Sequence, residues 1–128
     1  MKRDFELIRK LLIFFENKQS PECVEVPPID GYDDRKIKTH LVLLYDAGLL
    51  RCEPVKSSTS DRAIYVIPFE MTWDGHEFLD KVRNESVWSR IRDIMASKGG
   101  SLAFSVINQV ATRFAMDTVL SSLKLNSC

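Results

Sequence analysis

Two residues with reactive side chains, His76 and Glu77, stand next to each other and are followed by Asp80. The order His-Glu-x-x-Asp is similar to the His-Glu-x-x-His motif of zinc proteases. In that motif two histidines one helical turn apart bind the metal, and the glutamate is the general base. Here an aspartate replaces the second histidine, and Gly75 directly precedes the pair. We therefore interpret the segment as the acidic start of a helix, with His76 packing beside Trp73.

Three cysteines, Cys23, Cys52 and Cys128, could in principle act as nucleophiles or metal ligands. Their number is odd and none stands in a CxxC pair, so no disulfide framework or zinc-ligand spacing is indicated, even with His40 added. A cysteine nucleophile needs an activating base and an oxyanion site, and the sequence places neither. Gly99-Gly100 follows a predicted helix rather than a strand, which excludes a phosphate-binding loop. We predict no catalytic residue, no metal and no cofactor.

A cluster of basic and polar residues between residues 35 and 40 has the composition of a DNA-contacting helix. On this interpretation the bases contact phosphates or guanine edges, the threonine and histidine help to read bases, and two bases in a following loop hold the DNA backbone. The candidate DNA-binding residues are Arg35, Lys36, Lys38, Thr39, His40, Lys56 and Arg62. The alternative is a solvated helix face whose positive charge is offset by Asp33, Asp34 and Asp46.

The apolar pattern predicts the elements that must position this cluster. A first helix, capped by Asp4, runs to about Asn17, and a second opens at Asp33 or Asp34 and ends at Gly48. The predicted strands are a short edge strand at Val24–Val26 and two longer strands at Leu49–Val55 and Ala63–Met71. The polar loop between the longer strands is too long for a tight turn and is therefore predicted to form a wing.

Three further helices are predicted after the second strand. Thr72 caps a helix that ends near Asn84, Ser86 caps the next, and Gly99-Gly100 ends it. A long final helix starts at Ser101 and reaches about Leu120. The tail Leu123–Cys128 is predicted to be frayed.

This order predicts an α+β, mainly helical fold: a winged-helix-like domain with a small β-wing and added C-terminal helices. One helix of the usual arrangement is missing. Only Lys18–Pro28 has room for it, and its three prolines oppose a helix.

Composition sets limits on function. The 128 residues suit a single globular unit, and 18 basic and 18 acidic residues give zero net charge. Residues 1–80 hold eleven basic and fifteen acidic residues, whereas residues 81–128 hold seven and three. This balance argues against assuming that DNA is the ligand. The apolar run Leu11–Phe15 is too short for a signal peptide or a membrane span, and we expect a cytoplasmic protein with no membrane partner.

Several strings resemble one group of proteins over nearly the whole chain. They are Met1-Lys-Arg-Asp4, Ile37–Leu41 with Asp46–Leu49, the string Thr-Trp-Asp-Gly-His-Glu-Phe-Leu-Asp ending at Asp80, Val87-Trp88 and Gly99-Gly-Ser-Leu102. The resemblance is to an uncharacterised bacterial and prophage family of unknown function. It implies a winged-helix-like domain and a bacterial or phage setting, but no activity.

The predicted organisation is a winged-helix-like domain at residues 1–84 and a helical extension at 85–128, packed on it or forming a dimer interface. The candidate interface residues are Trp88, Ile91, Met95, Ile107, Val110 and Phe114. We expect a non-enzymatic, homodimeric DNA-binding regulator of phage or prophage type that binds double-stranded DNA. The alternative is a protein-interaction module, an adaptor or inhibitor of a host or phage protein, with no nucleic-acid role.

Overall fold

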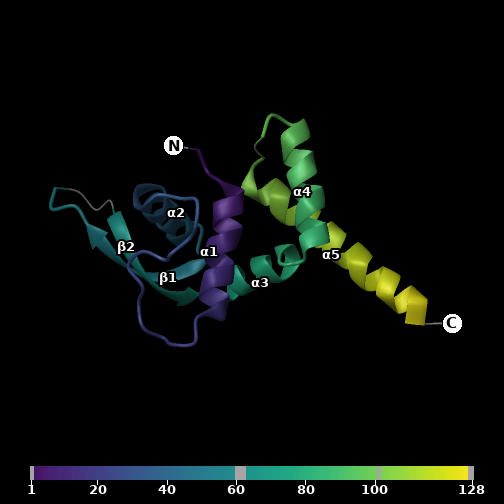
Figure 1. Cartoon of the computed structure of the whole chain (residues 1–128), viewed down its shortest axis with the longest axis horizontal. Coiled ribbons are helices and arrows are strands. Elements are labelled where there is room, and N and C mark those ends of the chain that lie inside the picture. The colour runs from purple at the N-terminus through teal and green to yellow at the C-terminus, as the bar shows by residue number, and fades with distance from the viewer. Residues whose placement is uncertain (1, 60–62, 101, 127–128) are drawn as a thin grey trace. The chain divides into compact units, whose positions relative to one another are not determined.

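The computed structural model describes residues 2–59, 63–100 and 102–126, with the backbone alone for 63–64 and 124–126 (Figure 1). These residues form five helices and one two-stranded antiparallel sheet, which confirms the predicted α+β, mainly helical fold. The chain divides into two compact units, Met1–Leu79 and Asp80–Cys128. The elements in chain order are α1 (Phe5–Asn17), α2 (Asp34–Asp46), β1 (Leu50–Lys56), β2 (Ala63–Met71), α3 (Trp73–Val82), α4 (Glu85–Ser97) and α5 (Phe104–Asn126).

Helices α1 and α2 begin at the predicted caps. The Asp4 side chain accepts a hydrogen bond from the Leu7 amide at 3.2 Å, and Asp33 accepts one from the Lys36 amide at 2.8 Å. These carboxylates satisfy amides that have no partner inside the helix. The apolar stripe of α1, with Ile8 in it, is buried.

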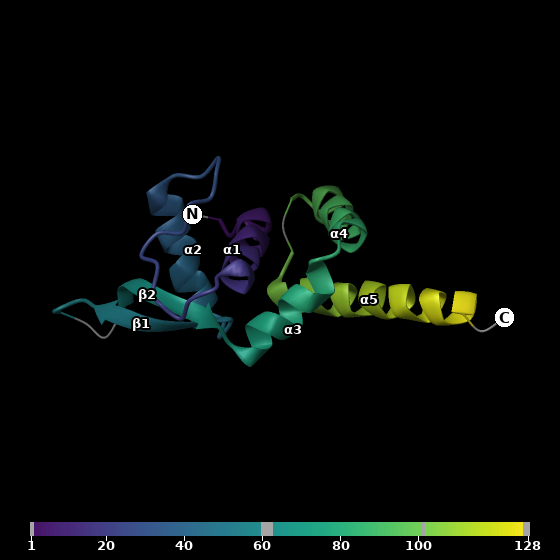
Figure 2. The same cartoon turned by 60° about the horizontal axis from the view of Figure 1, so that its bottom comes forward.

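Strands β1 and β2 form a hairpin that is the wing of the fold. The pairing runs from Leu50 opposite Met71 to Lys56 opposite Ala63, with register shifts near both ends. β2 has the predicted bounds, and β1 starts and ends one residue later than predicted. Helices α1 and α2 pack on the hairpin and lie on one side of it (Figure 2). The result is a winged-helix-like arrangement.

The segment between α1 and α2 contains neither a helix nor a strand. The missing helix is therefore not supplied here, and the predicted strand at Val24–Val26 is wrong. Two hydrogen bonds tie the segment to β2: the Val24 amide donates to the Pro68 carbonyl at 3.4 Å, and Lys18 Nζ donates to the Phe69 carbonyl at 2.9 Å. Pro27 and Pro28 have no amide hydrogen, so a ladder cannot continue past Val26.

The C-terminal end of α2 lies next to the N-terminal end of α3, and one side chain bonds to both. Gly48 takes a φ of 77°, which ends α2 as predicted. Thr72 caps α3, as predicted, by accepting a hydrogen bond from the Gly75 amide at 3.1 Å. The same hydroxyl donates to the Gly48 carbonyl, so one side chain joins the two helix ends.

In the second unit α4 packs against α5. Asn84, not the predicted Ser86, caps α4; its side chain accepts from the Ser86 and Val87 amides at 2.8 and 3.2 Å. Helix α5 continues to Asn126, past Leu123, where the frayed tail was predicted to begin; residues 127 and 128 of that tail lie outside the described residues. Neither Gly nor Pro follows Gly100 in the sequence, so no residue stops the helix earlier. The predicted helix start at Ser101 falls on a residue outside the described ranges.

Candidate functional site

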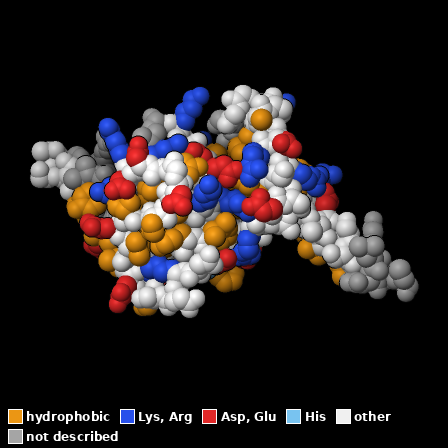
Figure 3. Space-filling model, in the orientation of Figure 1, with side chains coloured by type: hydrophobic (Ala, Val, Ile, Leu, Met, Phe, Trp, Pro, Cys, Tyr) orange, Lys and Arg blue, Asp and Glu red, His pale blue; other side chains and the backbone are white. Residues whose placement is uncertain are grey.

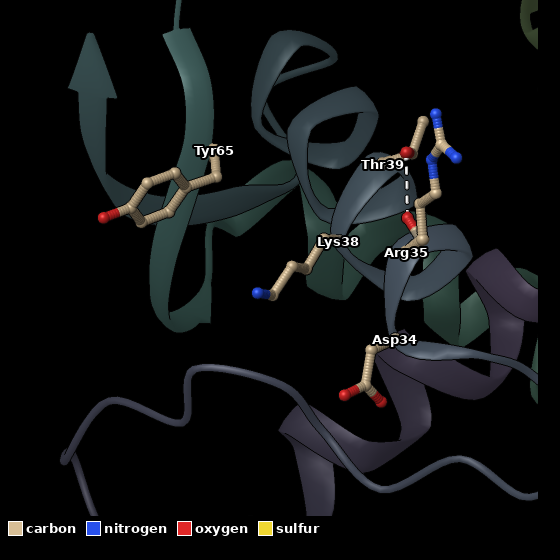
Figure 4. Close-up of a pocket in the computed structure, with 5 residues that line it drawn as sticks. All are labelled: Asp34, Arg35, Lys38, Thr39 and Tyr65. Carbon is tan, nitrogen blue, oxygen red and sulfur yellow. Dashed lines mark hydrogen bonds between the residues drawn. The ribbon is translucent and has the colours of Figure 1, made fainter.

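An open groove of about 540 Å³ lies between the outer face of α2 and β2 (Figure 4). Its lining residues are Asp34, Arg35, Lys38, Thr39 and Tyr65. The two basic side chains are exposed, and Tyr65 is 39% exposed. The groove thus brings two cations, a hydroxyl and an aromatic ring to one surface, with one carboxylate at its edge.

The amphipathic pattern of α2 produces this face. Ile37, Leu41 and Leu44 are buried against the rest of the first unit, so the helix turns residues 35 and 38 outward. Thr39 is half-buried, and its hydroxyl donates to the Arg35 carbonyl at 2.9 Å, which satisfies the donor within the helix.

His40 does not belong to this face, and its predicted role in reading bases is wrong. The side chain has no exposed surface. Nε2 accepts from the Asp4 amide at 2.8 Å, so Nδ1 carries the proton and donates to the Lys36 carbonyl, also at 2.8 Å. Both ring nitrogens are therefore used inside the fold.

Lys36 also points away from the groove, contrary to the prediction. Its Nζ lies 2.9 Å from Asp4 Oδ2 and 5.2 Å from the centre of the Tyr32 ring. Burial raises the pKa of Asp4, but the bonds from Lys36 and from the Leu7 amide outweigh it, so that the pKa is lowered overall. The hydrogen bond to Asp4 raises the pKa of Lys36. This lysine joins α2 to the start of α1.

Of the two bases predicted to hold the DNA backbone, the structure describes Lys56 but not Arg62. Lys56 is exposed at the end of β1, where it pairs with the start of β2. Arg62 lies outside the described residues. Tyr65 was not predicted as a site residue, and Asp34 was predicted to start the helix or to offset its positive charge rather than to line a groove. Tyr65 is followed by the buried Val66 in β2, so strand alternation was the signal that could have placed it on the outer face.

The predicted dimer interface is largely inside the chain. Trp88, Ile91 and Ile107 are at most 1% exposed and Met95 is 8% exposed, so these four cannot meet a second copy without unfolding. Val110 and Phe114 are half-buried. The Arg90 guanidinium lies 3.8 Å from the centre of the Phe114 ring and covers part of that ring.

The histidine, carboxylate and thiol side chains that could carry chemistry form no metal-binding group among the described residues. His76 and Glu77 are exposed on α3, and His76 does not share a buried site with Trp73, which is 76% exposed. Burial raises the pKa of the Cys52 thiol to about 11, which keeps it protonated at neutral pH. In the described part of the chain no three His, Cys, Asp or Glu residues stand close enough to hold a metal ion. Among the same residues, the helices lack an apolar stretch of the length that a membrane span requires.

Fold and groove together define a winged-helix-like protein with an exposed cationic face on its second helix. The chain belongs to the family described as "Hypothetical protein (DUF2513)", whose sequence model matches residues 2–101. It is 35% identical over 112 residues to an uncharacterized protein of Haemophilus influenzae, a match that covers 87% of this chain and 92% of the relative. The predicted membership of an uncharacterised family is thus confirmed. No solved structure matches the chain.

Proposed function

We propose that the protein is a non-enzymatic DNA-binding regulator that contacts duplex DNA through the groove between α2 and β2. The observation that supports this is the convergence of Arg35, Lys38 and Thr39 with Tyr65 on one open surface. Arginine and lysine bind phosphates and guanine edges, and a helix of this width enters the major groove. Lys56, exposed at the end of β1, is available for the DNA backbone beside it.

The mixed charge of the surface and of the groove predicts modest affinity for DNA. Lys and Arg are interspersed with Asp and Glu over the face seen in Figure 3, without a broad field of one sign. Asp33 is engaged as the cap of α2, but Asp34 lies in the groove and repels phosphate. The groove and the end of β1 offer three described bases, Arg35, Lys38 and Lys56, whereas Arg51 at the other end of β1 is paired with Glu70. About three phosphate contacts correspond to a slope of log K against log salt of roughly −3.

The test is fluorescence anisotropy of a labelled duplex titrated with protein at low and near-physiological salt. Replacing Arg35 and Lys38 by Ala should reduce the slope by about two units and weaken binding at low salt. The matched control replaces Lys2 and Lys98, two exposed lysines outside the groove, by Ala and removes the same charge. Equal loss in both double variants would reject the groove as the docking face. No binding by the wild type at low salt would reject the DNA proposal itself.

A protein-interaction module is the second candidate, and Trp73 favours it. This side chain is 76% exposed at the first position of α3, and tryptophan is enriched among residues that dominate protein interfaces. An adaptor of a host or phage protein would capture its partner after nuclease treatment and lose it in a Trp73→Ala variant. Capture that nuclease abolishes would count against this role.

Regulators of this architecture commonly bind DNA as dimers across two half-sites. The proposed function therefore requires a surface for a second copy other than the buried stripe of α4 and α5.

A further inference from the structure

The C-terminal half of α5 carries a row of apolar side chains that its own unit does not cover. Met116, Val119, Leu120 and Leu123 are between 47% and 58% exposed. Their spacing of three, four and seven residues puts them on one face of the helix. Figure 2 shows this half of α5 extending past α4. We call these four residues the α5 stripe.

The α5 stripe is separate from the face that packs on α4. Ile107 and Ala111 are fully buried on the first half of the helix. At about 100° per residue, the stripe is turned by roughly half a circle from those two side chains. A shift of α5 along its axis against α4 would therefore leave the stripe uncovered. The first half of the helix has an apolar face that α4 covers, and the second half has another apolar face on the opposite side, which requires a different partner.

Charge selects the class of partner. Between Thr112 and Leu123 the sequence holds one base, Arg113, and one acid, Asp117. A helix that lies on an anionic membrane or on nucleic acid presents several lysines or arginines beside its apolar face. The α5 stripe has almost no charge to attract either, and equally little to repel a copy of itself.

The spacing also makes the stripe self-complementary. A two-fold axis between Val119 and Leu120 sets Val119 of one helix opposite Leu120 of an antiparallel copy. The same axis sets Met116 opposite Leu123 at both ends. All four side chains then meet an apolar partner, as a symmetric interface requires. We propose that the α5 stripe is the site at which a second copy of this chain binds in antiparallel orientation.

The size of the stripe predicts a weak pair. Four side chains about half exposed leave on the order of 400 Å² per copy in water, so a pair buries on the order of 800 Å², less than a standard interface. The dissociation constant is accordingly expected on the order of 10–100 µM.

Sedimentation equilibrium of the full chain over about 5 to 500 µM brackets that range and tests the proposal. Leu120→Glu puts a charge at the centre of the stripe and should weaken self-association at least about tenfold. Ser121→Glu adds the same charge to an exposed residue on the other side of the helix and should leave association within about twofold. A wild type that stays monomeric, or equal association of both variants, would overturn the proposal.

A charge exchange tests the orientation. Met116→Glu and Leu123→Lys should each weaken association, and the double variant should recover most of it, because opposite charges then meet only in an antiparallel pair. Failure of the double variant to recover would overturn the antiparallel orientation.

Two other occupants give distinct results, and each would overturn the proposal. If the rest of this chain covers the stripe in solution, the wild type is monomeric and Leu120→Glu lowers the thermal midpoint while Ser121→Glu does not. If a lipid surface covers it, the monomeric wild type floats with vesicles of anionic lipid and Leu120→Glu does not.

Discussion

A fully buried histidine joins α2 to the start of α1. His40 Nε2 accepts a hydrogen bond from the Asp4 amide and Nδ1–H donates one to the Lys36 carbonyl, so neither nitrogen is left without a partner. A buried polar group costs free energy unless it is satisfied in this way. The histidine is therefore a structural residue, and the groove on the opposite face of α2 depends on it only through the position of the helix.

Replacing His40 by Ala should destabilise the protein by about 2–4 kcal/mol, since it opens a cavity and leaves the Asp4 amide without its acceptor. Urea unfolding followed by circular dichroism measures this. The control is Thr39→Ala on the neighbouring half-buried residue, which loses one bond within the helix and should cost about 1 kcal/mol or less. Equal effects at both positions would contradict the structural role of His40.

Asp4 gives the first unit a dependence on pH. Its pKa is lowered in the folded chain because the bonds from Lys36 and the Leu7 amide outweigh burial. A lowered folded pKa contributes stability that is present above the unfolded pKa and is lost as pH falls through the folded pKa. The partners are partly exposed, so the effect is small.

We therefore expect Asp4→Asn to be less stable than the wild type at neutral pH and nearly equal to it at about pH 2, where the carboxyl is protonated. Urea unfolding of both proteins across that range gives the difference. In a Lys36→Met background the neutral-pH difference should shrink. A constant difference between wild type and Asp4→Asn at all pH values would mean that the carboxylate charge has no part in it.

The sequence contained the signal for His40, and the interpretation did not use it. Ile37, His40, Leu41 and Leu44 have the spacing of one helix face, so the histidine stands within the apolar stripe. The basic residues on both sides suggested a DNA-contacting role. Arg35, Lys38 and Thr39 do line the groove, because helical periodicity alone sets their direction. The direction of Lys36 depends on Asp4 and Tyr32, which helical periodicity does not place.

At the scale of elements, two backbones approach closely at the junction of α2, β1 and α3. Gly75 lies in α3 directly against the backbone of Leu49, which precedes β1. A Cβ at position 75 would overlap the Leu49 carbonyl oxygen and press on Met71. A glycine inside a helix normally weakens it, so the close approach of two backbones explains why alanine does not suit this position.

Gly75→Ala is expected to destabilise the protein by about 3 kcal/mol, although alanine is the better helix former, because α3 must move away from Leu49. Gly48→Ala is the comparison: nothing lies near its Cβ position, and only the positive φ opposes it, at about 1–2 kcal/mol. Thermal and urea unfolding of both variants test the order. A neutral or stabilising Gly75→Ala would contradict the packing of α3 against Leu49.

Local patterns predicted the elements well where the cause is local. Asp4, Asp33 and Thr72 each cap a helix by accepting a hydrogen bond from the amide three residues further on. The run of β-forming residues in β2 predicted its bounds. Two failures have non-local or competing causes. The path of residues 18–33 depends on hydrogen bonds to Pro68 and Phe69, which lie far along the sequence in β2. Asn84 and Ser86 are both suitable caps, and the side chain of Asn84 reaches two amides.

At the scale of the whole molecule, an apolar stripe does not identify its partner. Trp88, Ile91 and Ile107 suggested an interface because a wing and two helices can close without them, but α4 and α5 bury them in the monomer. The α5 stripe has the same kind of pattern and remains exposed. Periodicity shows that a face must be covered, and only the tertiary structure shows whether the chain covers it.

The groove and the α5 stripe together predict that DNA binding depends on duplex length. A molecule with zero net charge gains DNA affinity mainly from the few bases of its groove and from Lys56, so two linked copies on one duplex bind more tightly than a single one. A duplex of about 30 base pairs has room for two copies one or two helical turns apart, whereas one of about 12 does not.

On the longer duplex Leu120→Glu should bind about tenfold more weakly than the wild type, and on the shorter duplex the two should bind alike. The Arg35→Ala, Lys38→Ala double variant should lose affinity on both duplexes and keep the self-association of the wild type, because its substitutions lie in the groove and not on α5. Anisotropy on the two duplexes, with sedimentation of the same samples, separates these effects. If the wild type and Leu120→Glu bind equally on both lengths, pairing through α5 and DNA binding are independent of each other, and the requirement for a dimer at the DNA is removed.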